Sequence, residues 1–191
     1  MENRNELYKI IPIFNSNLKD DEINNFSVRY AQAKNLVRYL YGKADAEEEN
    51  NLMRTYIVRD NLSDELVGYF SLKAGMISIN EQKNGDYDFF DTRPAVELAN
   101  FAINNNYIKN NPESKGCGII IFSKYIIPII MQAAKKIGIK YVFIYSLPMQ
   151  SLINRYKKYR FKRLSSKQEK ELHKRLKPKY DRGCIFMYQE L

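Results

Sequence analysis

A short stretch with two glycines, Glu113–Gly118, has the residue types of an anion-binding turn. Gly116 and Gly118 lack side chains, so backbone N–H groups beside them can approach a phosphate closely. An apolar stretch of helix length follows, and the N-terminus of a helix adds favourable partial charge for an anion. Tyr156 comes one predicted strand further along the chain, where its hydroxyl could supply a proton. This order suits a group-transfer enzyme that uses a phosphate-bearing acyl carrier.

The glycine spacing excludes two common phosphate-binding motifs. The chain has no Gly-Lys-Ser/Thr sequence with the spacing of a P-loop. The dinucleotide-binding fingerprint requires a small third residue, whereas Ile121 stands three residues after Gly118. Two glycines one residue apart also occur in plain turns. The functional interpretation therefore depends on the context, which includes Lys115 and the hydroxyl of Ser114.

The composition indicates an ordinary globular protein with a basic surface. The 191 residues are 45% hydrophobic, which is enough for one compact domain with a core. A net charge of +9, from 31 Lys and Arg against 22 Asp and Glu, attracts anionic partners such as phosphorylated cofactors or nucleic acids. The same charge is also expected of a basic surface that only contacts solvent.

Cysteine and histidine content argues against three further kinds of site. Cys117 and Cys184 are too few for a disulfide framework or a zinc site, and His173 is the only histidine available to activate a cysteine. We therefore expect no bound metal.

The apolar stretch Ile119–Ala134 contains Lys124 and Pro128 and is too short to span a bilayer. No secretory signal is visible, so a cytoplasmic protein without a membrane is expected.

Hydrophobic periodicity predicts an α+β fold in a single domain covering residues 1–191. The expected strands cover Tyr8–Phe14, Thr55–Arg59, Leu66–Ala74, Pro94–Ile103, Tyr141–Leu147, Phe161–Leu164 and Cys184–Leu191. The expected helices cover Glu22–Tyr41, Ile119–Ile137, Gln150–Tyr159 and Ser165–Leu176. The patch Asp45–Glu49 fits a loop or a short helix, and Asn80–Arg93 and Asn104–Asn111 are expected to be loops. Pro128 predicts a kink or a break in its helix.

The order of these motifs resembles the Gcn5-related N-acetyltransferases. That family forms its pyrophosphate turn from a sequence close to Gln/Arg-x-x-Gly-x-Gly/Ala, and Glu113–Gly118 matches it at both glycines. Members also carry Tyr-x-x-x-Gly-Phe late in the fold, and Tyr156–Phe161 matches the tyrosine and the phenylalanine. Val67–Leu72 is similar to the third strand of the family and Glu97–Ile103 to its central fourth strand. The resemblance covers residues 8–164 and the final strand.

The chain departs from the family pattern at three positions. Glu113 replaces the leading amide or basic residue of the turn, and Arg160 replaces the glycine before Phe161. Met149 occupies the place, seven residues before Tyr156, where the family often has an asparagine that contacts pantetheine. A relative that binds acyl-CoA without catalysis therefore stays open as an alternative.

The resemblance implies a mixed, mainly antiparallel sheet with helices on both faces, and transfer of an acetyl group from acetyl-CoA to a primary amine. It assigns cofactor binding to the backbone of the fourth strand and to the glycine turn, namely Phe101, Ala102, Ile103, Ser114, Lys115, Gly116, Cys117, Gly118 and Ile119. Glu97, the carboxylate on the central strand, is the candidate base, and Tyr156 the candidate acid for the departing thiolate. The alternatives are a solvent-facing or lysine-paired Glu97 and a Tyr156 that only packs in the core.

A basic segment, residues 157–179, raises a second hypothesis about the acceptor. Its Lys and Arg residues are interleaved with Tyr159 and Tyr180 and could neutralise nucleic-acid phosphates, or could simply face solvent. Some family members are toxins that acetylate the amino group of charged tRNA, and the N-terminal half of this chain is similar to theirs. Acetylation of aminoacyl-tRNA is thus the alternative function. The acceptor and the oligomeric state, including a homodimer, stay open.

Overall fold

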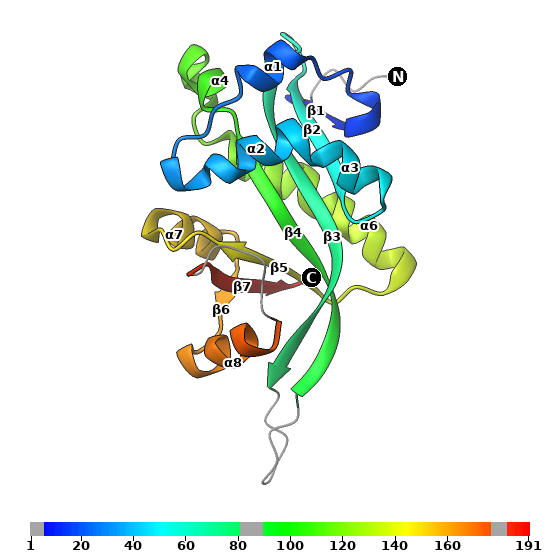
Figure 1. Cartoon of the computed structure of the whole chain (residues 1–191), viewed down its shortest axis with the longest axis vertical. Helices are drawn as coiled ribbons and strands as arrows, with labels where there is room; N and C mark the ends of the chain where they lie inside the picture. The colour runs from blue at the N-terminus through cyan, green and yellow to red at the C-terminus, as the bar shows by residue number, and fades with distance from the viewer. Residues whose placement is uncertain (1–5, 81–89, 177–182) are drawn as a thin grey trace. The chain divides into compact units, whose positions relative to one another are not determined.

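The computed structural model describes residues 6–80, 90–176 and 183–191 (Figure 1). Strands join in one seven-stranded sheet with the order β1-β2-β3-β4-β5-β7-β6. The pairs β1–β2, β2–β3, β5–β7 and β6–β7 are antiparallel, and the pair β4–β5 is parallel. The strands are β1 Tyr8–Pro12, β2 Arg54–Asp60, β3 Leu66–Asn80, β4 Phe90–Ile103, β5 Tyr141–Ser146, β6 Lys162–Arg163 and β7 Ile185–Glu190. The predicted α+β class with a mainly antiparallel sheet is confirmed.

Helical segments account for most of the remaining described chain. The α-helices are α1 Asp20–Asn24, α2 Lys34–Gly42, α3 Ala44–Glu49, α4 Asn105–Asn110, α5 Cys117–Ile121, α6 Ile127–Ile137, α7 Gln150–Lys158 and α8 Ser166–Leu176. Short 3₁₀ turns cover Ile13–Asn15, Ala31–Ala33 and Pro112–Ser114, and a π-helical turn covers Phe122–Ile126.

The chain divides into two compact units. Unit 1 comprises Met1–Lys73 and Leu98–Ile126, and unit 2 comprises Ala74–Glu97 and Ile127–Leu191. The single domain expected from the sequence stays a prediction.

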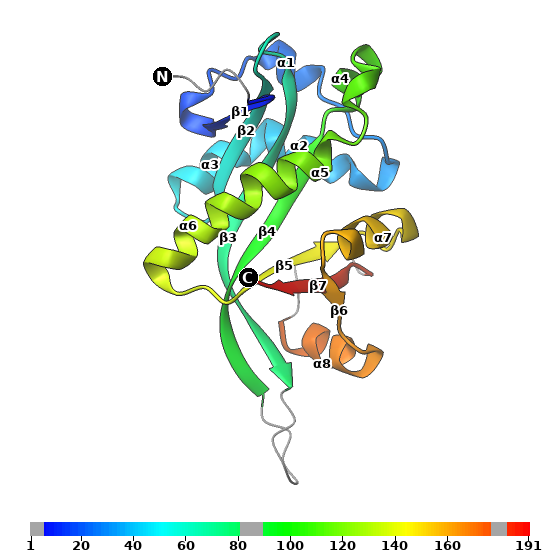
Figure 2. The ribbon, with the colours of Figure 1, turned by 180° about the vertical axis from the view of Figure 1, so that it is seen from behind.

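In unit 1, helices cover both faces of the strands. The two views show α2 and α3 on one face and α5 on the other (Figures 1 and 2). The core under α2 is aromatic: the rings of Tyr39 and Tyr69 stack 6.0 Å apart, and Phe26 lies 5.7 Å from Tyr69. Gly68 on β3 is required for close packing, because a Cβ there would lie 2.4 Å from the carbonyl oxygen of Ala102 on β4.

The core of unit 2 lies on β5 and β7. Phe143 and Phe186 pack with ring centres 5.6 Å apart, and Leu164 and Leu172 join the same buried cluster. Gly75 on β3 leaves room for the Phe143 ring, because a Cβ would stand 3.0 Å from it. The strand Tyr141–Leu147 expected from the sequence is confirmed as the centre of this core.

One predicted helix and one predicted loop are wrong, and a second predicted loop is wrong only at its described ends. The helix expected over Glu22–Tyr41 is broken into α1, a 3₁₀ turn and α2. The loop expected over Asn104–Asn111 contains α4, whose N-cap Asn104 accepts a hydrogen bond from the Asn106 amide. Of the loop expected over Asn80–Arg93, residues 81–89 lie outside the described residues, and β4 already begins at Phe90.

The break in the first predicted helix and the formation of α4 have the same physical cause. Asn104 accepts a hydrogen bond from the Ser27 amide at 3.2 Å, and Asn106 donates to the Asn25 carbonyl at 2.8 Å. These bonds hold residues 25–27 out of helical geometry, so the first helix ends at Asn24. The amides that suggested a loop instead cap one helix and interrupt another.

The helix that follows the glycine turn is interrupted as Pro128 predicts. A proline has no N–H to donate, and its ring clashes with the carbonyl four residues earlier, here that of Lys124. The π-helical turn Phe122–Ile126 contains this carbonyl and widens the helix just before the proline. The helix is not buried on every side, because Ile119 and Met131 are exposed.

The helical run Cys117–Ile137 also bears on the membrane question. The most apolar 18 of its 21 residues have a mean hydropathy of 1.7, and 33% of these 18 are buried, so by length and composition alone this run could cross a bilayer. The expectation that the stretch is too short is therefore wrong on length. Because core helices of soluble proteins meet the same criteria, the absence of a membrane stays a prediction.

Candidate functional site

The predicted anion-binding turn is built by a 3₁₀ turn, a left-handed glycine and the start of α5. Pro112–Ser114 form the 3₁₀ turn, and Gly116 at φ +94° is the N-cap of α5. This φ favours glycine, and a Cβ at Gly116 would meet nothing within 4 Å, so the backbone here faces open space. Glycine is therefore needed for conformation, and the surface above it stays accessible to a ligand.

Three of the six backbone donors expected for a pyrophosphate are already used within the turn. The amide of Ser114 donates to Asn111, that of Lys115 to Pro112 and that of Ile119 to Gly116. Gly116, Cys117 and Gly118 stand at the start of α5, where a helix leaves its first amides without intrahelical acceptors. The predicted cradle is thus concentrated on these three residues, beside the exposed Lys115.

The predicted pantetheine contacts lie at the end of β4. The ladder of β4 with β5 covers Ala95–Glu97, and β4 continues beyond it to Ile103. Within unit 1, β4 is the edge strand of the β1-β2-β3-β4 segment. An extended ligand can therefore hydrogen-bond to one backbone edge at Phe101–Ile103 in the manner of an added strand.

Tyr156 occupies the C-terminal end of α7, and the spacing of its motif is that of a helix cap. The Phe161 amide donates to the Tyr156 carbonyl at 3.0 Å, and the Arg160 amide donates to Lys157, also at 3.0 Å. These two bonds define a Schellman motif, and the ring contact of Tyr156 with Phe161 at 5.6 Å is its usual apolar partner. The Tyr-to-Phe spacing is accordingly explained by capping, and it also fixes the Tyr156 ring.

The hydroxyl of Tyr156 keeps its proton over a wide pH range. Burial raises its pKa to about 12, and the neighbouring Tyr159 adds to this effect. The Tyr159 ring stands perpendicular to Tyr156 at 5.9 Å. A phenol in this environment can donate a proton but is not an effective base at neutral pH.

Glu97 is buried on β4, directly opposite Phe143 of β5. Its alternative placement, on a solvent-facing strand surface, is therefore wrong. Burial raises the pKa of Tyr145 to about 12, and the charge of nearby Glu97 contributes in the same direction. A buried carboxylate on the central strand has the chemistry expected of a general base.

The structure groups the predicted residues by role. All the predicted cofactor-binding residues lie in unit 1, and Glu97 and Tyr156 both lie in unit 2.

Within residues 6–80, 90–176 and 183–191, no group of three His, Cys, Asp or Glu side chains could hold a metal ion.

Comparison with solved structures identifies the fold. A mutant AtaT toxin bound to the C-terminus of the antitoxin AtaR and acetyl-CoA aligns with a TM-score of 0.65 at 16% identity, covering 97% of this chain and 94% of that one. A mutant of KacT gives 0.67 at 16% identity, with coverage of 97% and 95%. AtaT complexed with acetyl-methionyl-tRNAfMet gives 0.62 at 17% identity, with coverage of 94% and 93%. No protein-family model and no curated protein matches the chain.

The chain has the fold of the Gcn5-related N-acetyltransferases. The predicted resemblance and fold class are confirmed at this level. The site residues taken from the family pattern stay predictions.

Two departures from the Gcn5-related pattern have clear structural effects. Arg160 adopts φ +70°, the left-handed conformation that the glycine of the pattern adopts easily. The cap is therefore retained although the residue type is unfavourable. Met149 is the N-cap of α7 and makes no capping bond with its side chain, whereas an asparagine at this position would. The third departure, Glu113, is exposed in the 3₁₀ turn.

Sequence reasoning missed the side chains that lie beneath the glycine turn. Tyr107 of α4 and Asp60 of β2 are linked by a 2.7 Å hydrogen bond, and Ser114 joins them through Tyr107. Asp60 lies 47 residues before Tyr107, and Tyr107 lies seven residues before Ser114, so no known motif spacing links the three. The only available signal was the hydroxyl of Ser114, which was interpreted as a free donor to the ligand and instead contacts Tyr107.

Proposed function

We propose that this protein is an acetyl-CoA-dependent N-acetyltransferase that acts on a primary amine. The observation that carries the proposal is the left-handed Gly116 at the start of α5, within the fold of the Gcn5-related N-acetyltransferases. The N–H groups of Gly116, Cys117 and Gly118 would bind the pyrophosphate, supported by the helix N-terminus. The backbone of Phe101–Ile103 would bind pantetheine.

The proposed chemistry needs two proton transfers, and unit 2 supplies a group for each. The amine attacks the thioester carbonyl only in its neutral form, and Glu97 would accept its proton directly or through a water molecule. The C–S bond then breaks, and Tyr156 would protonate the thiolate that leaves. A pKa of about 12 keeps Tyr156 in the donor form at neutral pH. The products are the acetylated amine and free CoA.

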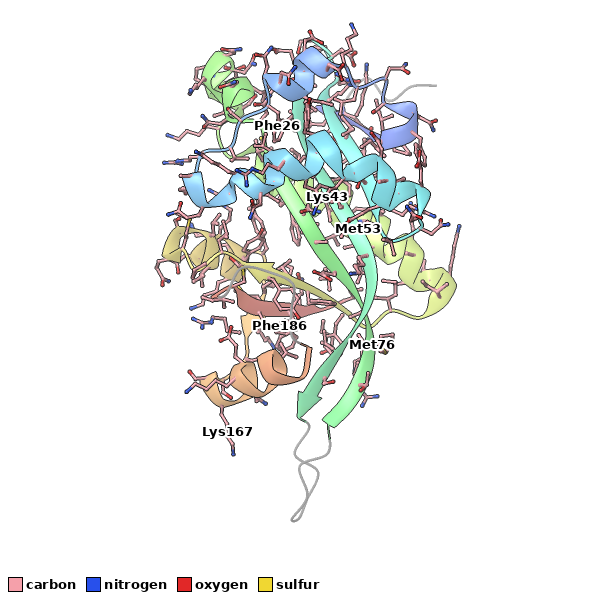
Figure 3. The ribbon with its side chains drawn as sticks, viewed as in Figure 1. Phe26, Lys43, Met53, Met76, Lys167 and Phe186 are labelled. Carbon is pink, nitrogen blue, oxygen red and sulfur yellow. The ribbon has the colours of Figure 1, made fainter. Side chains whose placement is uncertain are left out.

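A second candidate acceptor is the amino group of aminoacyl-tRNA. In unit 2, basic side chains are exposed along α7, β6 and α8, and Lys167 projects away from its helix (Figure 3). They are Arg155, Lys157, Lys158, Arg160, Lys162, Arg163, Lys167 and Lys170. AtaT, whose fold this chain shares, has been solved with acetyl-methionyl-tRNAfMet. Surface lysines and arginines of this density suit contacts with a phosphate backbone.

Not every part of the basic segment supports this candidate. Tyr159 is buried, so it is unable to stack on a base as an interleaved aromatic would. The structure does not describe the side chains of Lys174 and Arg175, and Lys177, Lys179 and Tyr180 lie outside the described residues. Apart from the fold shared with AtaT, the tRNA hypothesis therefore depends on charge alone. A homodimer and a cytoplasmic location stay predictions.

One assay tests both candidates and the non-catalytic alternative. Release of free CoA thiol from acetyl-CoA is followed with simple amines, aminoglycosides, peptides and charged methionyl-tRNA as acceptors. We expect turnover with at least one acceptor, and the proposed function is wrong if CoA binds but no acceptor supports release. Glu97→Gln should lower kcat by about 100-fold or more while leaving the affinity for CoA unchanged. Unchanged turnover in this variant would exclude Glu97 as the base.

A further inference from the structure

A chain of three hydrogen-bonded side chains supports the glycine turn from below. The Tyr107 hydroxyl donates to Asp60 Oδ2 at 2.7 Å and lies 3.2 Å from Ser114 Oγ. Because the single phenolic proton of Tyr107 is directed to the carboxylate, the Ser114 hydroxyl must be the donor in the second bond. The chain therefore runs from Ser114 in the turn, through Tyr107 on α4, to Asp60 at the end of β2.

Asp60 is the fixed, ionised end of this series of hydrogen bonds. Its other oxygen, Oδ1, accepts the amides of Leu62 at 2.8 Å and Ser63 at 3.0 Å. Burial acts to raise the pKa of Asp60, but the hydrogen bonds, led by that from Tyr107, outweigh it and leave the pKa below its usual value. A carboxylate bound by three donors does not move easily, so it anchors the Tyr107 hydroxyl.

A second buried phenol contacts the turn on both sides of its exposed part. The side chains of Ser114 and Cys117 both interact with the hydroxyl of buried Tyr8, whose pKa is raised to about 12 chiefly by burial. Lys115 and Gly116, which lie between these two residues, are exposed. The turn is thus held through the side chains of Ser114 and Cys117, while Lys115 and Gly116 between them stay exposed.

We infer that Tyr107 and Asp60 are positioning residues for the anion-binding turn, and that they set its affinity for the phosphate groups of the acyl carrier. The inference rests on the proposed function, because it takes the bound anion to be the pyrophosphate of CoA. A turn that is already held in its binding geometry loses less conformational entropy when the anion binds. Removal of the Tyr107 hydroxyl leaves the Ser114 side chain held by Tyr8 alone, so the turn is less rigid and ordering it around the anion lowers the affinity.

The test compares CoA with pantetheine, which lacks all the phosphates. Both probes are titrated into wild-type protein and into Tyr107→Phe by calorimetry. We expect the Kd for CoA to rise about three- to ten-fold, the size of one lost hydrogen bond, while the Kd for pantetheine stays the same. Tyr69→Phe is the matched control: it also removes a buried phenolic hydroxyl from unit 1, one that donates to the Leu36 carbonyl at 2.6 Å. It should change neither Kd.

Ser114→Ala breaks the same series of hydrogen bonds at its other end. We expect it to weaken CoA binding at least as much, because it also removes the contact of Ser114 with Tyr8, and we expect the double variant Tyr107→Phe/Ser114→Ala to be no weaker than Ser114→Ala alone. Wild-type affinity for CoA in Tyr107→Phe would overturn the inference, as would equal losses for CoA and pantetheine. If the wild-type protein binds neither probe, the proposed function itself is wrong, and the inference with it.

Discussion

Phe161 caps the helix that carries Tyr156, because its amide bonds to the Tyr156 carbonyl at 3.0 Å and the two rings meet at 5.6 Å. The candidate proton donor and its apolar support therefore belong to one local structure. This structure needs a left-handed residue between them, and Arg160 is that residue, at φ +70°. The cap consequently carries backbone strain that a glycine would relieve.

Arg160→Gly should raise the free energy of unfolding by about 0.5–1 kcal/mol. The left-handed conformation costs an L-residue about 1–2 kcal/mol, and the greater freedom of glycine in the unfolded chain cancels part of the gain. Arg160→Ala removes the same charge but keeps the Cβ, so urea denaturation should show no gain for this control. Equal stabilisation by both variants would mean that the charge of Arg160, and not its backbone conformation, is unfavourable.

Tyr156→Phe should lower kcat by about 100-fold and leave the Kd for CoA unchanged. Because the folded pKa of Tyr156 is raised to about 12, the hydroxyl stays protonated as pH rises and is lost as a donor only near that value. The kcat of the wild-type protein should therefore show no decline between about pH 7 and pH 10 that comes from this group. A decline in that range that disappears in Tyr156→Phe would contradict the assignment.

Glu22→Gln tests an ion pair that joins α1 to β2. Both terminal nitrogens of Arg59, Nη1 and Nη2, donate hydrogen bonds to the Glu22 carboxylate. The side chain of Arg59 is only 6% exposed and that of Glu22 22%. The hydrogen bond from Arg59 leads the effects that lower the pKa of Glu22. A lowered folded pKa gives stability that is present above the unfolded value and lost as pH falls through the folded one.

The variant should therefore unfold about 2 kcal/mol more easily at pH 7, and the difference from wild type should shrink below about pH 4. Asp64→Asn provides the control, since it removes an exposed ion pair with Lys9 in the same unit. That change should cost less than about 0.5 kcal/mol at any pH. A difference between Glu22→Gln and wild type that is independent of pH would exclude the ion pair as its source.

Lys157→Ala/Lys158→Ala tests the contact of unit 2 with RNA. Both side chains are exposed near the end of α7. If each contacts a phosphate, the plot of log affinity for tRNA against log salt should flatten by about 1.5 in slope. Lys135→Ala/Lys136→Ala removes two exposed lysines from α6 and should leave the slope unchanged. Identical slopes for the two double variants would remove the support for a tRNA acceptor.

Local sequence signals were sufficient to predict the elements whose structure depends only on residues close in the sequence. The strand at Tyr141–Ser146 and the helix at Gln150–Lys158 both lie close to the bounds expected from the sequence. The turn at Gly116 was also visible, because its left-handed backbone needs glycine whatever surrounds it. These features depend on neighbours within a few residues.

Sequence reasoning failed where distant residues decide the local structure. The break after Asn24 depends on Asn104 and Asn106, which bond to residues 77 and 81 positions away. The same limit explains why Tyr107 and Asp60 were missed beneath the turn, because no spacing predicts a contact between α4 and the end of β2. Tyr156 shows a different limit: its motif was recognised, but the spacing reports a helix cap as readily as a catalytic role.

Asn104 also constrains the order in which the chain can fold. Its side chain binds the Ser27 amide and the Leu66 carbonyl, so it joins two segments that are synthesised long before it. On a ribosome, unit 1 remains incomplete until residues 98–126 have emerged, although its first 73 residues are made early. During that interval the aromatic core around Tyr69 lacks its final strand and exposes apolar surface. The nascent chain should accordingly depend on chaperones most strongly just before Asn104 leaves the exit tunnel.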